Sequence, residues 1–208
     1  MTIERMGRLP RMKKESEDYE INSYRNSSIY PFMTVLCKGI FHRTSVEGYR
    51  GMLRDGLILS NTGSFPFSYP QSKTYYGYSK GYISLFDFES SREEDYLTNY
   101  HTWEQFFFDH KPVTIVLRLN RGWLAPKLIP NSERPQIDEQ GYKASIPYVE
   151  VWYPEPIPLS VIDDYFITWD ARDSDAIRWL HFPKNDLSAF EEVLTWVEST
   201  NRTPQLSH

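Results

Sequence analysis

Three positions in the chain carry side chains suited to chemistry and stand in strand-like runs. His42 and Arg43 close the apolar run 34–43, and Glu150 stands in a later run. A carboxylate held in such a run can stabilise positive charge as it develops on a reacting carbon. Between them, residues 69–82 include several tyrosines, whose rings stack on flat ligands such as nicotinamide or a base, or anchor a long loop. Taken singly, a histidine or glutamate of this kind is more often a surface or packing residue.

The remaining candidate groups predict neither a metal site nor redox chemistry. Cys37 is the only cysteine, so it forms no internal disulfide, and its apolar surroundings favour a small buried side chain. Three further histidines have no spacing typical of a catalytic triad or of metal ligands: His101, His110 and His181. We therefore expect a site that works without a metal ion.

Length and composition are typical of one globular domain. The chain has 208 residues, of which 40% are hydrophobic and 25% charged. We interpret residues 1–28 as a basic, flexible segment and residues 29–208 as a single domain. The longest apolar runs are too short to span a membrane and the start lacks the apolar core of a secretory signal, so we expect a cytoplasmic protein with no membrane partner. The net charge of −5 gives no overall attraction to nucleic acid, although the first 14 residues are locally basic.

The order of the expected elements indicates an α+β fold. Strand-like runs cover 34–43, 81–88, 113–120, 145–153 and 165–169, and helical patterns cover 91–109 and 187–199. Long turn-rich connections occupy 57–80 and 122–144. Most strands follow one another without a helix between them, so we predict a largely antiparallel or mixed sheet.

A short helix is expected directly after the first strand. Thr44-Ser45-Val46-Glu47 has the spacing of a capping box, in which the threonine hydroxyl and the glutamate carboxylate satisfy two backbone amides. Val46, Tyr49 and Leu53 then share one helical face, and Gly56 ends the helix because glycine tolerates a left-handed conformation. The C-terminal helix has an apolar face made of Phe190, Val193, Leu194 and Val197.

These elements resemble the core of the ADP-ribosyltransferase family. The run from Gly39 to Asn61 is similar to the start of that core in poly(ADP-ribose) polymerases and DarT-type toxins, where a strand ends in His-x-Ser/Thr and a short helix ends in a glycine. Gly81 to Asp87 looks like the family's second strand, and Tyr148 to Tyr153 like its closing strand, which carries the catalytic glutamate. Each motif alone is weak, but their order and spacing reinforce one another.

The resemblance implies both a fold and a reaction. The fold would be a split mixed or antiparallel β-sheet with short flanking helices, and the reaction would be mono-ADP-ribosyl transfer, with NAD as substrate and no metal. Glu150 would stabilise the oxocarbenium-like ribose carbon, His42 would bind the adenosine ribose, and a tyrosine would stack on nicotinamide. Depending on the alignment, the central member of the family's His-Tyr-Glu set would be Tyr82, Ile83 or Ser84. The residues that the resemblance places at NAD are His42, Arg43, Thr44, Gly56, Tyr78, Tyr82 and Ser84.

Two choices within this site stay open. Strand alternation lets only one of the neighbours His42 and Arg43 face the ligand. If Arg43 faces NAD, and Ser84 rather than Tyr82 acts on the second strand, the chain resembles the Arg-Ser-Glu branch of the family, which includes many bacterial protein-modifying toxins.

Glu150 has one competitor for the catalytic role. Glu155 follows a little further along, between Pro154 and Pro156. Because this is a turn position rather than a strand, Glu150 remains the first candidate.

The acceptor of the ADP-ribose is predicted from the resemblance. DarT-type and related enzymes carry long loops before the second strand and before the glutamate, and they modify nucleic-acid bases; long loops occur here at 57–80 and 122–144. We therefore expect a toxin or phage-defence enzyme that modifies RNA, similar to CmdT-type toxins, or single-stranded DNA, with an antitoxin protein as a partner. The alternatives are a protein acceptor, an NAD hydrolase effector and a non-catalytic ADP-ribose-binding module.

Overall fold

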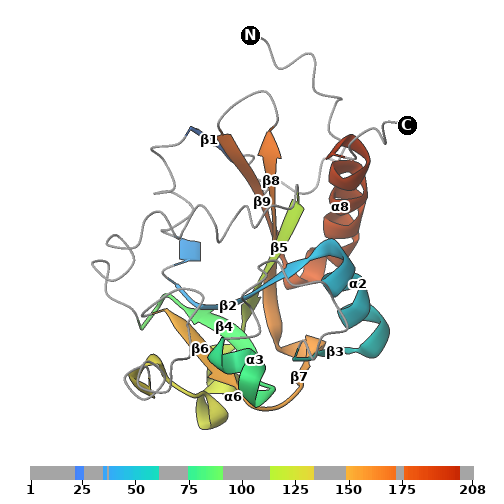
Figure 1. Cartoon of the computed structure of the whole chain (residues 1–208). Helices are drawn as coiled ribbons and strands as arrows, with labels where there is room; N and C mark the ends of the chain where they lie inside the picture. The colour runs from blue at the N-terminus through green and yellow to red at the C-terminus, as the bar shows by residue number, and fades with distance from the viewer. Residues whose placement is uncertain are drawn as a thin grey trace, which may run out of the picture.

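A seven-stranded sheet organises the chain (Figure 1). The computed structural model describes residues 22–25, 35–36, 38–60, 75–90, 113–133, 149–171 and 176–201. The strands of the sheet are β1 (Asn22–Arg25), β2 (Ile40–Ser45), β4 (Ile83–Asp87), β5 (Val113–Leu119), β6 (Glu150–Tyr153), β8 (Ile162–Ala171) and β9 (Ala176–Pro183). The helices are α2 (Val46–Asp55), α3 (Tyr76–Lys80), α6 (Arg121–Leu124) and α8 (Leu187–Asn201). A separate small ladder joins β3 (Leu57–Ile58) to β7 (Ile157–Pro158).

The strands follow the order β1-β9-β8-β5-β2-β4-β6, and each pair of neighbours is antiparallel. This confirms the expected α+β class with a largely antiparallel sheet. The order in the sheet departs from the order in the sequence at one important place. Although β5 lies between β4 and β6 in the sequence, it pairs with β2 and β8. As a result, β6 lies at one edge of the sheet, next to β4.

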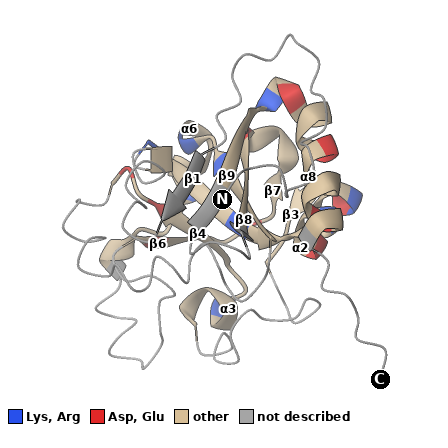
Figure 2. Ribbon diagram, turned by 90° about the horizontal axis from the view of Figure 1, so that it is seen from above, with Lys and Arg blue, Asp and Glu red and all other residues tan. Residues whose placement is uncertain are grey.

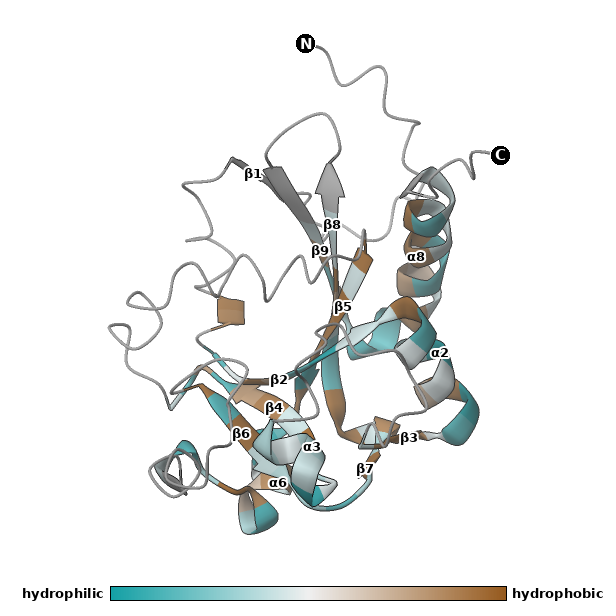
Figure 3. Ribbon diagram, viewed as in Figure 1, coloured by the Kyte–Doolittle hydropathy of each residue, from teal (hydrophilic) through white to brown (hydrophobic). Residues whose placement is uncertain are grey.

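Two helices, α2 and α8, cover one face of the sheet. Both contact β5, and α8 also contacts β8. The apolar face expected for α8 is fully buried in this core; its residues are Phe190, Val193, Leu194 and Val197. Hydrophobic residues accordingly follow the strands (Figure 3), while charged residues mark the outer sides of α2 and α8 (Figure 2). This face therefore serves as the structural core.

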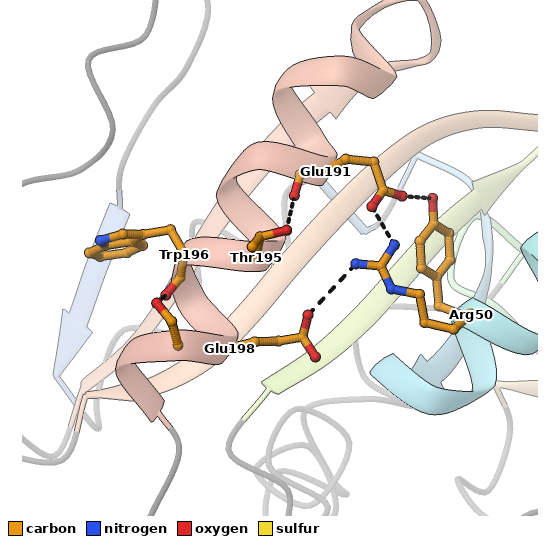
Figure 4. A network of polar contacts seen from close by, with 7 residues as sticks. Arg50, Glu191, Thr195, Trp196 and Glu198 are labelled. Carbon is orange, nitrogen blue, oxygen red and sulfur yellow. Dashed lines mark hydrogen bonds and ion pairs between the residues drawn. The ribbon is translucent and has the colours of Figure 1, made fainter.

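Polar contacts fix α2 against α8 (Figure 4). The Tyr49 hydroxyl donates a 2.9 Å hydrogen bond to Oε1 of Glu191, and Arg50 forms ion pairs with Glu191 and Glu198. Burial and the nearby Glu191 carboxylate raise the pKa of Tyr49, so its hydroxyl remains a hydrogen-bond donor. Because α2 begins directly after β2, this network also holds the end of β2 in place.

The start of α2 differs by one residue from the expectation. Ser45, not Thr44, is the N-cap: its side chain accepts a 3.1 Å hydrogen bond from the Gly48 amide. Val46 and Tyr49 are buried as expected, but the face continues through Met52, while Leu53 is 38% exposed. Gly56 ends the helix as expected, with φ of 69° in the left-handed region.

Some strand boundaries also differ. The first strand begins only at Ile40, because residues 35–36 are helical; an apolar run without alternation is compatible with either structure. The strand expected at 165–169 extends over Ile162–Ala171, and β9 was not expected at all. The helix expected at 91–109 and Cys37 lie outside the described residues, as do residues 1–21 of the basic segment.

The described helices give no candidate for a membrane span, since none is both long and apolar enough.

Candidate functional site

The three strands that carry the candidate residues lie side by side, in the order β2, β4, β6. Phe41 of β2 pairs with Phe86 of β4, and Phe86 pairs with Glu150 of β6. Residues that pair directly across a ladder point to the same face of a sheet. Phe41, Phe86 and Glu150 therefore form a row across one face, which we call the Glu150 face.

Arg43 and Ser84 also belong to the Glu150 face. Side chains alternate along a strand, and each of these residues lies two positions from a member of the row. Ser84 pairs with Trp152, which makes Ser84 a diagonal neighbour of Glu150. If the register of β2 with β4 were continued, Arg43 would stand opposite Ser84. Of the two neighbours at the end of β2, the arginine thus shares the face of the glutamate.

The side chains of His42 and Thr44 point to the opposite face of the sheet. They pair with Leu117 and Ile115 of β5, two residues of the core beneath α2 and α8. The Thr44 side chain lies against the start of α2, since an added Cβ on Gly48 would come within 2.2 Å of its hydroxyl. The structure therefore does not bring His42 and Thr44 onto the Glu150 face.

The His42 ring is held at the boundary between β2 and β4. Its Nδ1 lies 3.1 Å from the carbonyl oxygen of Ser84 and must donate the hydrogen, because a carbonyl only accepts. Burial lowers the pKa of His42 to about 4; the bond to the Ser84 carbonyl raises it in part and the Arg43 charge lowers it further. At neutral pH the ring is therefore neutral, with Nδ1 protonated and Nε2 as an acceptor.

This lowered pKa predicts a loss of stability in acid. The ordinary pKa of 6.5 applies to the unfolded chain, whereas the folded value is about 4. As the pH falls below 6.5, His42 takes up a proton in the unfolded chain but not in the folded protein. The free energy of unfolding therefore decreases until about pH 4. Relative to neutral pH, we expect the titration of His42 to lower the free energy of unfolding by about 2–3 kcal/mol near pH 4.5.

Denaturant unfolding of the wild type and of His42→Asn, each at neutral pH and near pH 4.5, measures this effect. The asparagine keeps a donor for the Ser84 carbonyl but does not titrate. Its stability should therefore fall less between the two pH values, and an identical fall in both proteins would contradict the assignment.

Glu150 is anchored by its backbone and almost completely buried. Its side chain is 1% exposed, and its carbonyl accepts a 2.9 Å hydrogen bond from the Asn131 side chain. Ile129 covers the outer edge of β6 through two backbone bonds with Trp152. A buried carboxylate is costly unless other groups compensate for the lost water. A buried carboxylate on a strand that is otherwise apolar is the strongest indication of function in this region.

Short helix α3 packs beside Ser84 and Trp152. An added Cβ on Gly77 would lie 2.7 Å from Ser84 Oγ and 2.7 Å from Trp152 Cδ1, so only a glycine permits this approach. The ring of Tyr76 meets Trp152 edge-on at 4.8 Å and Tyr82 at 6.1 Å. Tyr82 therefore stands at the end of an aromatic group that reaches the strand of Glu150, and it is half-buried.

Two other candidates lie apart from this group. Gly56 is at the far end of α2, where its carbonyl accepts a hydrogen bond from the Leu159 amide. Glu155 is 52% exposed and forms a 2.6 Å ion pair with Lys127. A third candidate, Tyr78, does not lie apart: it is half-buried in α3, the helix beside Ser84. Of the two competing glutamates, only Glu150 is buried within the strand cluster.

A second polar cluster lies on the same face, and no pattern in the sequence predicts it. Arg118 pairs across the ladder with Phe41 and with Asp164, so all three point to the Glu150 face. Asp164 is buried, forms an ion pair with Arg118 and lies 3.0 Å from Nε2 of His181. These residues are far apart in the sequence, and β9, which carries His181, was not expected.

The sequence likewise carries no signal for the roles of Gly77 and Trp152. Their importance depends on the packing of α3 against β6, which no local pattern reveals.

Within the described ranges, no group of three or more histidine, cysteine, aspartate or glutamate residues is arranged to hold a metal ion. No family model, curated protein or solved structure matches this chain.

Proposed function

We propose that the protein is an NAD-dependent mono-ADP-ribosyltransferase, and one observation carries this proposal. The three sequence motifs that resemble the family fall on β2, β4 and β6, which are immediate neighbours in the sheet. Since β5 separates β4 from β6 in the sequence but pairs elsewhere, this neighbourhood does not follow from chain order. The convergence of three separate motifs supports a common site more strongly than their spacing alone.

In the proposed reaction, the bond between nicotinamide and C1′ of its ribose breaks. Nicotinamide leaves as a neutral molecule with the bonding electron pair, and positive charge develops on C1′. Glu150 would stabilise this charge, and its burial favours the task because electrostatic interactions are stronger away from water. The acceptor then bonds to C1′ and loses a proton, which completes the transfer.

The other residues of the Glu150 face supply binding groups. Arg43 would hydrogen-bond the phosphates of NAD, because a guanidinium matches phosphate oxygens with two parallel bonds. Ser84, the diagonal neighbour of Glu150, would hold a ribose hydroxyl. Tyr76 and Tyr82 are half-buried and their rings meet edge-on, and the ring of Tyr82 would stack on nicotinamide. In this arrangement Arg43 rather than His42 faces NAD.

A protein is the acceptor favoured by this geometry. Arg43, Ser84 and Glu150 share one face, and such a set resembles the Arg-Ser-Glu branch with its protein-modifying toxins. The net charge of −5 is also compatible with a protein acceptor. The second candidate acceptor is a nucleic acid, either RNA or single-stranded DNA. The long connections expected at 57–80 and 122–144 and the basic first 14 residues favour this candidate. In either case we propose a toxin or phage-defence effector.

Incubation of the purified protein with adenine-labelled NAD and separate pools of protein, RNA and DNA tests this proposal. We expect nicotinamide release and label retained by the protein pool. Label retained by RNA or DNA would instead select the nucleic-acid acceptor, and free ADP-ribose as the sole product would select an NAD hydrolase. A folded protein that releases no nicotinamide under any of these conditions would overturn the proposed function.

A further inference from the structure

The sheet separates between β2 and β4 immediately beside the site. The ladder of β2 with β4 contains only the pairs Ile40–Asp87 and Phe41–Phe86. On its other side, β2 remains paired with β5 as far as Ser45. From His42 onward, β2 therefore pairs with β5 alone among the described strands, and within the described part of the chain residues 83–85 of β4 have no ladder partner on the side of β2.

The Ser84 carbonyl is directed into this separation. The Asp87 amide donates a 2.8 Å bond to Val149, toward β6, while the Phe88 amide donates a 3.3 Å bond to Gly39, toward β2. Backbone groups of successive residues point to alternate sides of a strand. Ser84, like Phe88, therefore turns its backbone groups toward β2, at a position where the ladder with β2 has already ended.

His42 supplies the donor that the ladder no longer provides. Its Nδ1 is 3.1 Å from the Ser84 carbonyl oxygen. A partly buried carbonyl without a donor is unfavourable, so this bond stabilises β4 at its separated end.

The Ser84 side chain leaves little room for movement of β4. An added Cβ on Gly77 would lie 2.7 Å from Ser84 Oγ, which shows how closely the hydroxyl approaches α3. Ser84 is at the same time a diagonal neighbour of Glu150. A rotation of β4 at Ser84 would therefore press the hydroxyl into α3 or change its position relative to the glutamate.

We propose that His42 is a positioning residue: by holding the Ser84 carbonyl at the separation of β2 and β4, it fixes the Ser84 hydroxyl beside Glu150. The inference rests on the proposed function, because it assigns His42 a role in the same site. It differs from direct binding of NAD by His42, which would use Nε2 rather than Nδ1.

Two amide substitutions distinguish the nitrogens of the ring. The side-chain nitrogen of asparagine reaches approximately the position of Nδ1, and that of glutamine the position of Nε2. His42→Asn therefore keeps the bond to Ser84 and removes the outer nitrogen, whereas His42→Gln does the reverse. His42→Ala removes both, and His181→Ala is the matched control for loss of a half-buried histidine elsewhere on the sheet.

The rate of nicotinamide release and its separation into kcat and KM are measured for all four variants. We expect His42→Ala and His42→Gln to lose about 10- to 100-fold in kcat, because small displacements of positioned groups have effects of this size, while His42→Asn recovers to within about threefold of the wild type. His181→Ala should behave as the wild type. Full activity of His42→Ala, or activity of the glutamine but not the asparagine variant, would overturn the inference.

Amide hydrogen exchange of residues 82–88 gives a readout that does not need NAD. Faster exchange in His42→Ala and His42→Gln, but not in His42→Asn, supports the contact between His42 and β4. Equal exchange in all variants would overturn it, whatever the activity. The expected exchange pattern together with a wild type that releases no nicotinamide would contradict the proposed function and the effect of His42 on kcat. It would still support the structural contact of His42 with β4.

Discussion

Replacing Glu150 with glutamine is expected to slow nicotinamide release from NAD by about 100- to 1,000-fold, the effect typical of losing one group that stabilises transition-state charge. Glutamine has nearly the same shape and leaves no cavity on β6, but it carries no negative charge for the developing cation at C1′. We therefore expect the loss in kcat, with little change in the melting temperature or in NAD binding. Steady-state kinetics, calorimetry of NAD binding and thermal unfolding measure the three quantities.

The matched control is Glu155→Gln. This glutamate follows the same strand but is 52% exposed and bonded to Lys127, and such exposed pairs contribute little. It should retain the activity of the wild type. A fully active Glu150→Gln, or an inactive Glu155→Gln, would show that the wrong carboxylate has been placed at the reacting carbon.

The largest effect on stability is expected for Phe41→Ala, which should lower the free energy of unfolding by about 3–5 kcal/mol. Phe41 is fully buried at the end of the row opposite Glu150. Its ring meets Phe88 at 5.9 Å and Phe166 at 6.0 Å, both edge-on, so it connects the strands of the candidate site to β8. Removing the ring leaves a cavity between these strands and also deletes two aromatic contacts.

Denaturant unfolding at neutral pH measures this loss. Phe41→Leu fills much of the cavity and should cost less than the alanine. Trp123→Ala removes a ring that is 42% exposed and packs on Tyr153, and it should cost less still. Equal effects at Phe41 and Trp123 would mean that the row across the Glu150 face is not tightly packed.

Elements with strong local patterns could be predicted from the sequence. The apolar face of α8 and the glycine that ends α2 appear as expected, because helical periodicity and a left-handed C-cap depend on neighbouring residues. The cap of α2 was placed one residue too early, since Thr44 and Ser45 both offer a hydroxyl and only the geometry of the strand end decides between them. The short strands β3 and β7 lack any local pattern.

The candidate site was predictable only in part. Alternation along β2 shows that His42 and Arg43 point to opposite faces, but not which of them shares the face of Glu150. That depends on the registers Phe41–Phe86 and Phe86–Glu150, which pair residues from distant parts of the chain. The separation of β2 from β4 and the contact of His42 with Ser84 have the same non-local origin.

The edge position of β6 has a consequence for synthesis on the ribosome. The strand that carries Glu150 is synthesised after the whole of β5 but pairs with β4, so a long stretch of chain separates the two strands that must meet at the candidate site. A nascent chain that stops before Tyr153 contains Arg43 and Ser84 but lacks the complete glutamate strand. Under the proposed function, a nascent chain would therefore gain a complete site only after β6 has been translated, and products that end earlier would lack the strand of Glu150.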